Sequence, residues 1–99
     1  MAKVAHKKEK EIAGAIIRQL HRLVTYGPWD LDIAAAMSAY GYDEVKWAEG
    51  QEVLAELIAC DRPGDRRLRA AQEWYREAAE VALRALGTRP RLLHKIGVV

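Results

Sequence analysis

The chain has 99 residues, of which 51% are hydrophobic and 30% are charged, so it can form a hydrophobic core and is not disordered in bulk. Its only cysteine, Cys60, cannot form an internal disulfide and supplies too few thiolates for a zinc site of cysteine and histidine. Alanine makes up much of the hydrophobic content, and phenylalanine is absent. The core of one copy is therefore built largely of small side chains. A short chain with a lean core usually needs a disulfide, a metal or oligomerisation, and oligomerisation is the option that remains.

Charge is distributed unevenly along the chain. Residues 1–25 hold six basic and two acidic side chains (+4), residues 26–60 hold one and seven (−6), and residues 61–99 hold nine and five (+4). We expect these charges to complement one another on neighbouring helices or subunits. The alternative is that a basic end meets an anionic partner.

The first apolar run, residues 12–24, is interrupted by Arg18, Gln19, His21 and Arg22. It is therefore too polar to span a membrane or to act as the core of a signal peptide. We expect a cytoplasmic protein that does not contact a membrane.

The first helix is predicted from about Glu9 to Tyr26, with residues 1–8 either frayed or continuing it. Its apolar residues share one arc of a helical wheel: Ile12, Ala13, Ile16, Ile17, Leu20, Leu23 and Val24. Gly27 and Pro28 are predicted to end it. If the helix includes Glu9, that carboxylate is buried or lies at an interface, and the alternative is that the helix begins after it.

Two further helices are predicted, each with an aspartate as its N-cap. Asp30 precedes a short helix, Leu31 to Tyr40, whose buried stripe comprises Ile33, Ala36, Met37 and Tyr40. Asp43 precedes a helix from about Glu44 to Cys60, in which Trp47, Leu54, Leu57 and Ile58 face one way. Gly50 lies inside that apolar arc, where glycine costs about 1 kcal/mol of helix propensity, so we expect a neighbouring helix to approach closely there.

Residues 61–65 form the clearest turn in the sequence, and the fourth helix is predicted from about Arg66 to Leu86, ending at Gly87. Its apolar residues cover more than half of the wheel, whereas contact with a core along one stripe needs an arc of only about 100°. We therefore expect this helix to contact partners on two sides. A last helical turn, Pro90 to Ile96, follows.

These elements predict an all-α, single-domain protein (residues 1–99): an antiparallel bundle of three long helices, one short helix and a C-terminal helical turn. Two copies of a helical hairpin readily make a four-helix bundle, so we expect the core to be completed in a homodimer or higher homo-oligomer. The faces of the first and fourth helices are the predicted interface, with Ile16, Leu20, Leu23, Trp74, Ala78 and Val81 as its candidate residues.

The sequence carries no catalytic, metal or cofactor signature. No glutamate is followed three residues later by histidine, the pair that di-iron bundles need. Cys60 lies beside Asp61, and an adjacent acid raises the pKa of a thiol. The glutamate rows lie opposite the apolar stripes, as on a solvated helix surface. We expect neither enzymatic activity nor a bound cofactor.

An arginine cluster is the best alternative site. Its members, Arg62, Arg66, Arg67 and Arg69, crowd the start of the fourth helix, where positive charge opposes the helix dipole. The cluster could pair with the acidic third helix or bind phosphate, RNA or DNA.

Residues 32–43, DIAAAMSAYGYD, followed by Trp47-Ala48-Glu49-Gly50, resemble a family of uncharacterised bacterial helical-bundle proteins. In that family a Tyr-Gly-Tyr break precedes a helix with a glycine in its second turn. The resemblance covers roughly residues 30–60 and implies helices but no chemistry. It implies a structural corner at Tyr40, Gly41, Tyr42 and Gly50, with positive φ at Gly41 and the tyrosines packed between helices.

The favoured function is a non-catalytic structural or protein-interaction module that associates with itself, with another protein as a further partner. The alternative is a small nucleic-acid- or anion-binding protein that uses the arginine cluster.

Overall fold

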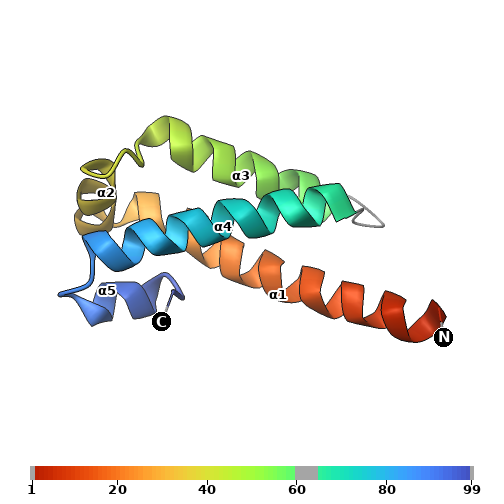
Figure 1. Cartoon of the computed structure of the whole chain (residues 1–99). Helices are drawn as coiled ribbons and strands as arrows, with labels where there is room; N and C mark the ends of the chain where they lie inside the picture. The colour runs from red at the N-terminus through yellow and green to blue at the C-terminus, as the bar shows by residue number, and fades with distance from the viewer. Residues whose placement is uncertain (1, 60–64, 99) are drawn as a thin grey trace.

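The computed structural model describes residues 2–59 and 65–98, with side chains from 11–59 and 66–98. These parts contain five helices and no strand: α1 (Ala2–Trp29), α2 (Leu31–Ser38), α3 (Glu44–Ala59), α4 (Asp65–Ala85) and α5 (Pro90–Lys95). The all-α prediction is confirmed. The helices α3 and α4 lie side by side and run in opposite directions, α1 packs against both, and α2 and α5 lie at one end (Figure 1).

Helix α1 includes residues 2–8, one of the two predicted alternatives, and extends beyond its predicted C-terminal end. It starts at Ala2, so residue 9 is within the helix, although the Glu9 side chain is outside the described side chains. It also continues through Gly27 and Pro28 to Trp29, so the prediction that these residues end the helix at Tyr26 is wrong.

Two local features let α1 pass through this pair of residues. Pro28 has no N–H to donate to the Val24 carbonyl, and the Gln51 side-chain amide of α3 donates to that oxygen instead, at 3.4 Å. Gly27 has no positive φ and acts as a packing residue, because a Cβ there would lie 2.6 Å from the Trp47 ring.

The predicted caps are confirmed. The Asp30 carboxylate accepts hydrogen bonds from the backbone N–H groups of Asp32 and Ile33, at 3.0 and 3.3 Å. The Asp43 carboxylate accepts from those of Val45 and Lys46, at 3.1 and 3.2 Å. These bonds satisfy N–H groups that a helix start leaves without a partner.

The corner between α2 and α3 has the predicted glycine conformation, since φ at Gly41 is 92°. Helix α2 ends at Ser38 rather than Tyr40. The Tyr40 side chain is 53% exposed, so its prediction as part of the buried stripe and as a packed corner residue is wrong. Tyr42 is the buried tyrosine of the corner.

An aromatic cluster fills the interior beside this corner. The Tyr42 ring meets Trp47 and Trp74 edge-on, with ring centroids 6.2 and 6.0 Å apart, an arrangement that aromatic pairs prefer. The Trp74 ring of α4 lies against Gly50 of α3 so closely that a Cβ would overlap it. The predicted close approach at Gly50 is therefore confirmed.

Helix α4 buries most of its wide apolar arc within one chain, and Leu83 is 48% exposed. Ala71, Trp74, Ala78 and Ala82 are buried, and the half-buried residues that flank them pack against the same core: Leu68, Tyr75, Val81 and Ala85. The arc is wide because α4 contacts α3 on one side and α1 on the other.

The C-terminal helix α5 is held against the corner by polar contacts. The Arg22 guanidinium of α1 donates to the His94 and Lys95 carbonyls, at 3.0 and 2.9 Å, and so satisfies oxygens at the end of α5. The Tyr75 hydroxyl donates to the Gly97 carbonyl at 3.1 Å. These contacts fix α5 beside α1 and α4.

Candidate interaction surfaces

The six predicted interface residues come together, but in the interior of one chain. Leu20, Leu23 and Ala78 are fully buried and Trp74 is 9% exposed. Ile16 and Val81 are half-buried and pack against this core. The sequence pattern located a real contact between α1 and α4, and the correction is that both helices belong to the same copy.

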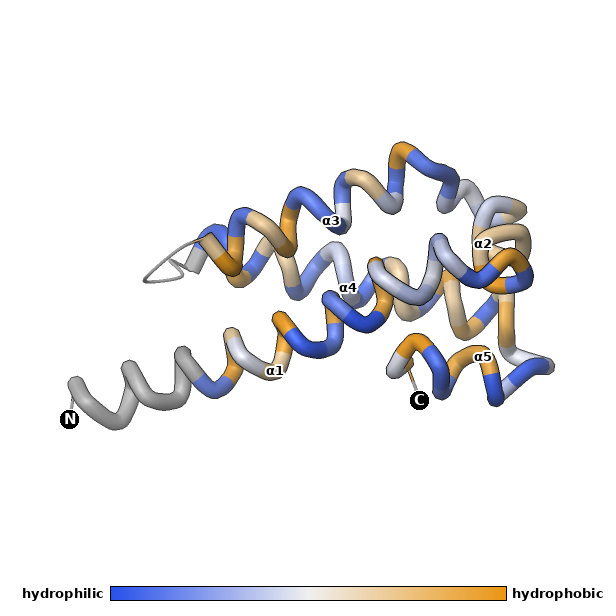
Figure 2. The backbone as a smooth tube through the Cα atoms, turned by 180° about the vertical axis from the view of Figure 1, so that it is seen from behind, coloured by the Kyte–Doolittle hydropathy of each residue, from blue (hydrophilic) through white to orange (hydrophobic). Residues whose placement is uncertain are grey.

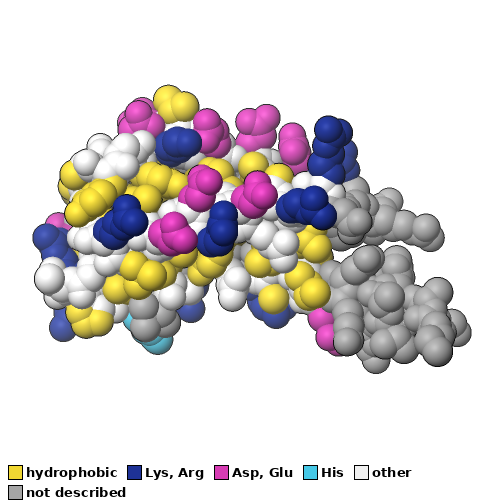
Figure 3. Space-filling model, in the orientation of Figure 1, with side chains coloured by type: hydrophobic (Ala, Val, Ile, Leu, Met, Phe, Trp, Pro, Cys, Tyr) yellow, Lys and Arg dark blue, Asp and Glu magenta, His cyan; other side chains and the backbone are white. Residues whose placement is uncertain are grey.

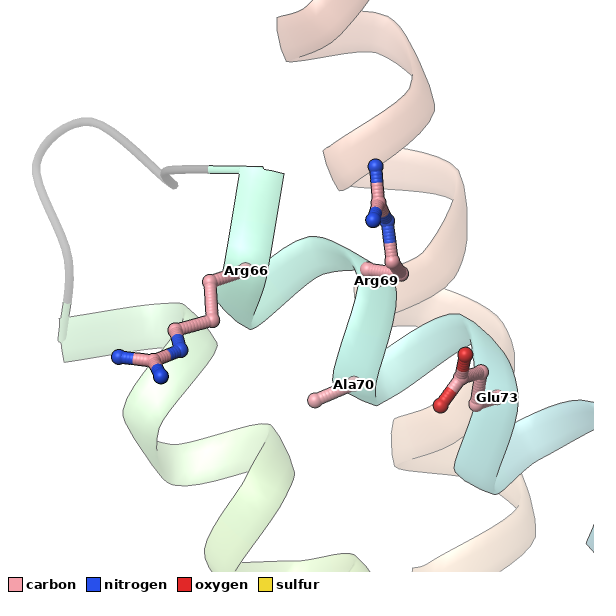
Figure 4. Close-up of a pocket in the computed structure, with 4 residues that line it drawn as sticks. All are labelled: Arg66, Arg69, Ala70 and Glu73. Atoms are coloured by element: carbon pink, nitrogen blue, oxygen red, sulfur yellow. The ribbon is translucent and has the colours of Figure 1, made fainter.

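The arginine cluster does not converge on one point. Arg62 lies outside the described residues, Arg67 already interacts within the chain, and Arg66 and Arg69 are exposed. The latter two line a shallow cavity of about 410 Å³ together with Glu73. Figure 4 shows their side chains pointing away from each other, with the Glu73 carboxylate on the same stretch of α4. A single phosphate would therefore meet a spread and partly neutralised charge.

A second surface, which the sequence did not indicate, lies where α2 meets α3. Its groove has a volume of about 320 Å³ and is lined mostly by apolar groups of α2, the linker and α3. We call it the corner groove, and its residues are Leu31, Ala34, Ala35, Ser38, Tyr42, Asp43, Glu44 and Trp47. Hydrophobic side chains are visible over this end of the molecule (Figure 3).

Two large apolar side chains at the junction of α1 and α2 face solvent. Leu31, at its edge, and Trp29, two residues earlier, are each 84% exposed. Tryptophan is usually extensively buried, and it is enriched at protein interfaces. The sequence feature that could have indicated this surface is the run Pro28-Trp29-Asp30-Leu31. Two large apolar residues flank an N-cap there, at a position where polar residues are common.

The corner, taken from here on as residues 28–47 where α1, α2 and α3 meet, is held by specific contacts. Besides capping α2, the Asp30 carboxylate pairs with the Lys95 ammonium group of α5 at 2.7 Å. That hydrogen bond, followed by the bond from the Ile33 N–H, holds the pKa of Asp30 below its usual value. On the α3 side, burial raises the pKa of Tyr42, whose ring is wedged against two tryptophans. A surface held in this way needs little ordering when a partner binds.

The charged residues that line the corner groove are acidic, Asp43 and Glu44. Asp32 lies in the first turn of α2, and residues 31–45 include no lysine or arginine. The next base, Lys46, pairs with Glu49 at 3.5 Å and lies over the Tyr42 ring. The groove therefore combines an apolar floor with negative charge at its edge.

The molecule is elongated and exposes much surface for its mass. Its radius of gyration is 14.1 Å, against about 13 Å for a compact domain of this length. Its accessible surface is 6890 Å², about a fifth above the roughly 5,700 Å² that a compact monomer of 11.2 kDa would expose. Helix α1 accounts for the long dimension, since it extends from the end with α2 and α5 toward the opposite end of the molecule (Figure 1; seen from behind in Figure 2).

Within the described residues no cluster of three or more histidine, cysteine, aspartate or glutamate side chains could hold a metal ion. The same residues include no helix with the length and hydropathy of a membrane span. Comparisons with protein-family models, curated proteins and solved structures find no match for this chain.

Proposed function

We propose that this chain is a non-catalytic protein-interaction module that associates with itself, as a homodimer of antiparallel helical bundles. The observation that carries the proposal is the pair of exposed residues Trp29 and Leu31 at the corner, where Leu31 also lines an apolar groove. Apolar patches of this kind on soluble proteins are typical of interaction sites.

The contact surface in this proposal is the corner and not the joined faces of α1 and α4, because most of the apolar residues of those faces are already buried inside one chain. Tryptophan side chains dominate many interfaces, where a handful of residues supply most of the binding energy. The large accessible surface of the single chain adds support, since association would cover part of it.

Sedimentation velocity from low to high micromolar concentration tests the proposal. We expect a reversible dimer for the natural sequence and a monomer for the double variant Trp29→Ser/Leu31→Ser. Ile58→Ser is the matched control, because Ile58 is also exposed (56%) but lies near the end of α3 farther from the groove, and it should leave the dimer intact. A natural chain that is monomeric at every concentration would refute self-association.

An anion-binding function for Arg62, Arg66, Arg67 and Arg69 is the second candidate, supported by the exposure of Arg66 and Arg69 in the first turns of α4. It predicts binding to a generic RNA or DNA that weakens steeply with salt and is lost in Arg66→Glu/Arg69→Glu. Fluorescence anisotropy with a labelled oligonucleotide measures it, and absence of binding at low salt would eliminate it.

A further inference from the structure

We propose that the corner groove of one copy binds the basic N-terminal segment of α1, residues 2–10, of a second copy, and that the two copies do so reciprocally. The inference rests on the proposed self-association and adds the segment that occupies the groove. It is carried by charge, by the positions of the two sites in the molecule and by surface area.

The charges of the two sites are opposite. Two acidic residues and no base line the groove, Asp43 and Glu44, and Asp32 follows the lining residue Leu31 in the sequence, whereas residues 2–10 include four lysines and one glutamate. Complementary positive and negative patches on two partners speed their association and fix the register in which they bind. The same segment contains Val4 and Ala5, aliphatic residues of a size suited to a groove of about 320 Å³.

The two sites lie at opposite ends of the molecule. Helix α1 has 28 residues and is about 42 Å long at 1.5 Å per residue, which is close to the 46 Å length of the whole chain. The N-terminus is at one end and α2 at the other (Figure 1). Two copies placed side by side in opposite directions would bring each N-terminal segment next to the other copy's groove, and such a twofold arrangement closes on itself.

The area available matches what such a dimer needs. A standard interface covers about 800 Å² on each partner. The accessible surface of this chain, 6890 Å², exceeds that of a compact monomer by roughly 1,200 Å², so the excess is larger than one side of a standard interface. Contact along the long axis can therefore cover a standard interface without opening the core.

A contact between two corner grooves is the competing arrangement, and charge disfavours it. It would bring the groove residues Asp43 and Glu44 of both copies together, and like charges placed close across an interface oppose binding. The two arrangements differ in their response to salt: added salt weakens the attraction between N-terminus and groove but relieves the repulsion between two grooves.

Charge exchange tests the inference by sedimentation velocity at low ionic strength. Lys7→Glu/Lys8→Glu and, separately, Asp32→Lys/Glu44→Lys should each raise the dissociation constant by on the order of tenfold or more. The chain carrying all four substitutions should regain most of the lost affinity, because opposite charges face each other again. Arg76→Glu/Arg84→Glu makes the same change in net charge as the lysine variant, at two exposed positions of α4 that belong to neither candidate site, and should leave the dimer unchanged.

Circular dichroism of each variant establishes that it is folded, and the other outcomes separate the two proposals. If Trp29→Ser/Leu31→Ser dissociates the dimer while Lys7→Glu/Lys8→Glu does not, self-association through the corner stands and the N-terminal occupant is wrong. A dimer that strengthens with added salt would also exclude the N-terminal segment as the occupant and leave self-association standing. A natural chain that never dimerises overturns both proposals.

Discussion

The aromatic cluster inside the molecule and the apolar surface at its corner use the same kinds of residue in opposite ways. Trp47 and Trp74 each lie against a glycine, Gly27 and Gly50, which lets a whole ring fit between two helices. Trp29 lies against none of the described glycines in this way and is 84% exposed. The contrast teaches that hydrophobic content alone does not assign a tryptophan to a core. What decides is whether an adjacent backbone leaves room for the ring.

For the interior aromatic cluster, the largest loss of stability is expected from a substitution at Gly50. Gly50→Val would place branched carbons where the Trp74 ring lies, and we expect the free energy of unfolding to fall by about 3 kcal/mol, at the upper end for an overfilled core. Urea denaturation followed by circular dichroism measures it. Gly14→Ala is the control, because its Cβ would meet only the end of Arg18 at 3.5 Å, and it should stabilise the chain by about 0.5 kcal/mol.

Gly27→Ala is the milder version of the same test. The new Cβ would approach the Trp47 ring to 2.6 Å, while alanine improves helix propensity by about 1 kcal/mol. We expect a net loss of about 1 kcal/mol in the free energy of unfolding. An increase in stability would contradict the packing role assigned to Gly27. The chemical shift of the Trp47 indole proton reports whether the ring moves.

Asp30→Asn probes the attachment of the corner to α5. Asparagine can cap α2 as well as aspartate does, so the substitution removes only the charge that pairs with Lys95. Because the pKa of Asp30 is lowered in the folded chain, its charge adds stability above the unfolded pKa of about 3.9, and this is lost as the pH falls through the folded pKa.

We therefore expect the natural chain to be more stable than Asp30→Asn at neutral pH, and the difference to close in acid. Urea titrations at a series of pH values measure it. Asp43→Asn is the control, since Asp43 caps α3 but forms no ion pair among the described residues. A gap that persists unchanged in strong acid would mean that the pair with Lys95 contributes nothing.

The smallest effect on stability is expected from substitutions of the exposed corner residues Trp29 and Leu31. Trp29→Ser/Leu31→Ser should change the free energy of unfolding of the monomer by no more than about 0.5 kcal/mol, because both side chains are exposed already. Denaturation at a concentration below dimerisation measures it. A loss as large as that at Gly50 would place these residues in the core and contradict the distinction between the two regions.

Local signals in the sequence predicted local structure well. Asp30 and Asp43 were identifiable as caps, Gly41 as a residue with positive φ, and Gly50 as a point of close contact, because each depends on only a few neighbouring residues. The passage of α1 through Pro28 could not be predicted, since the hydrogen bond that permits it comes from Gln51 on another helix.

The candidate site was harder to predict than the fold. A helical wheel shows that α1 and α4 have apolar faces but not which chain covers them, so Leu20, Leu23 and Ala78 were assigned to a dimer interface although they are buried within one copy. The exposure of Trp29 depends on where α2 turns away from α1, and residue spacing does not encode that direction.

The contacts between α1 and α5 also close a long loop of the chain. Arg22 and Asp30 bond to His94 and Lys95, which lie 65 to 73 residues away in the sequence. Bringing such distant residues together costs chain entropy before the contacts can form. We therefore expect the contacts of α5 to form late in refolding, after the helices that are neighbours in the sequence have paired.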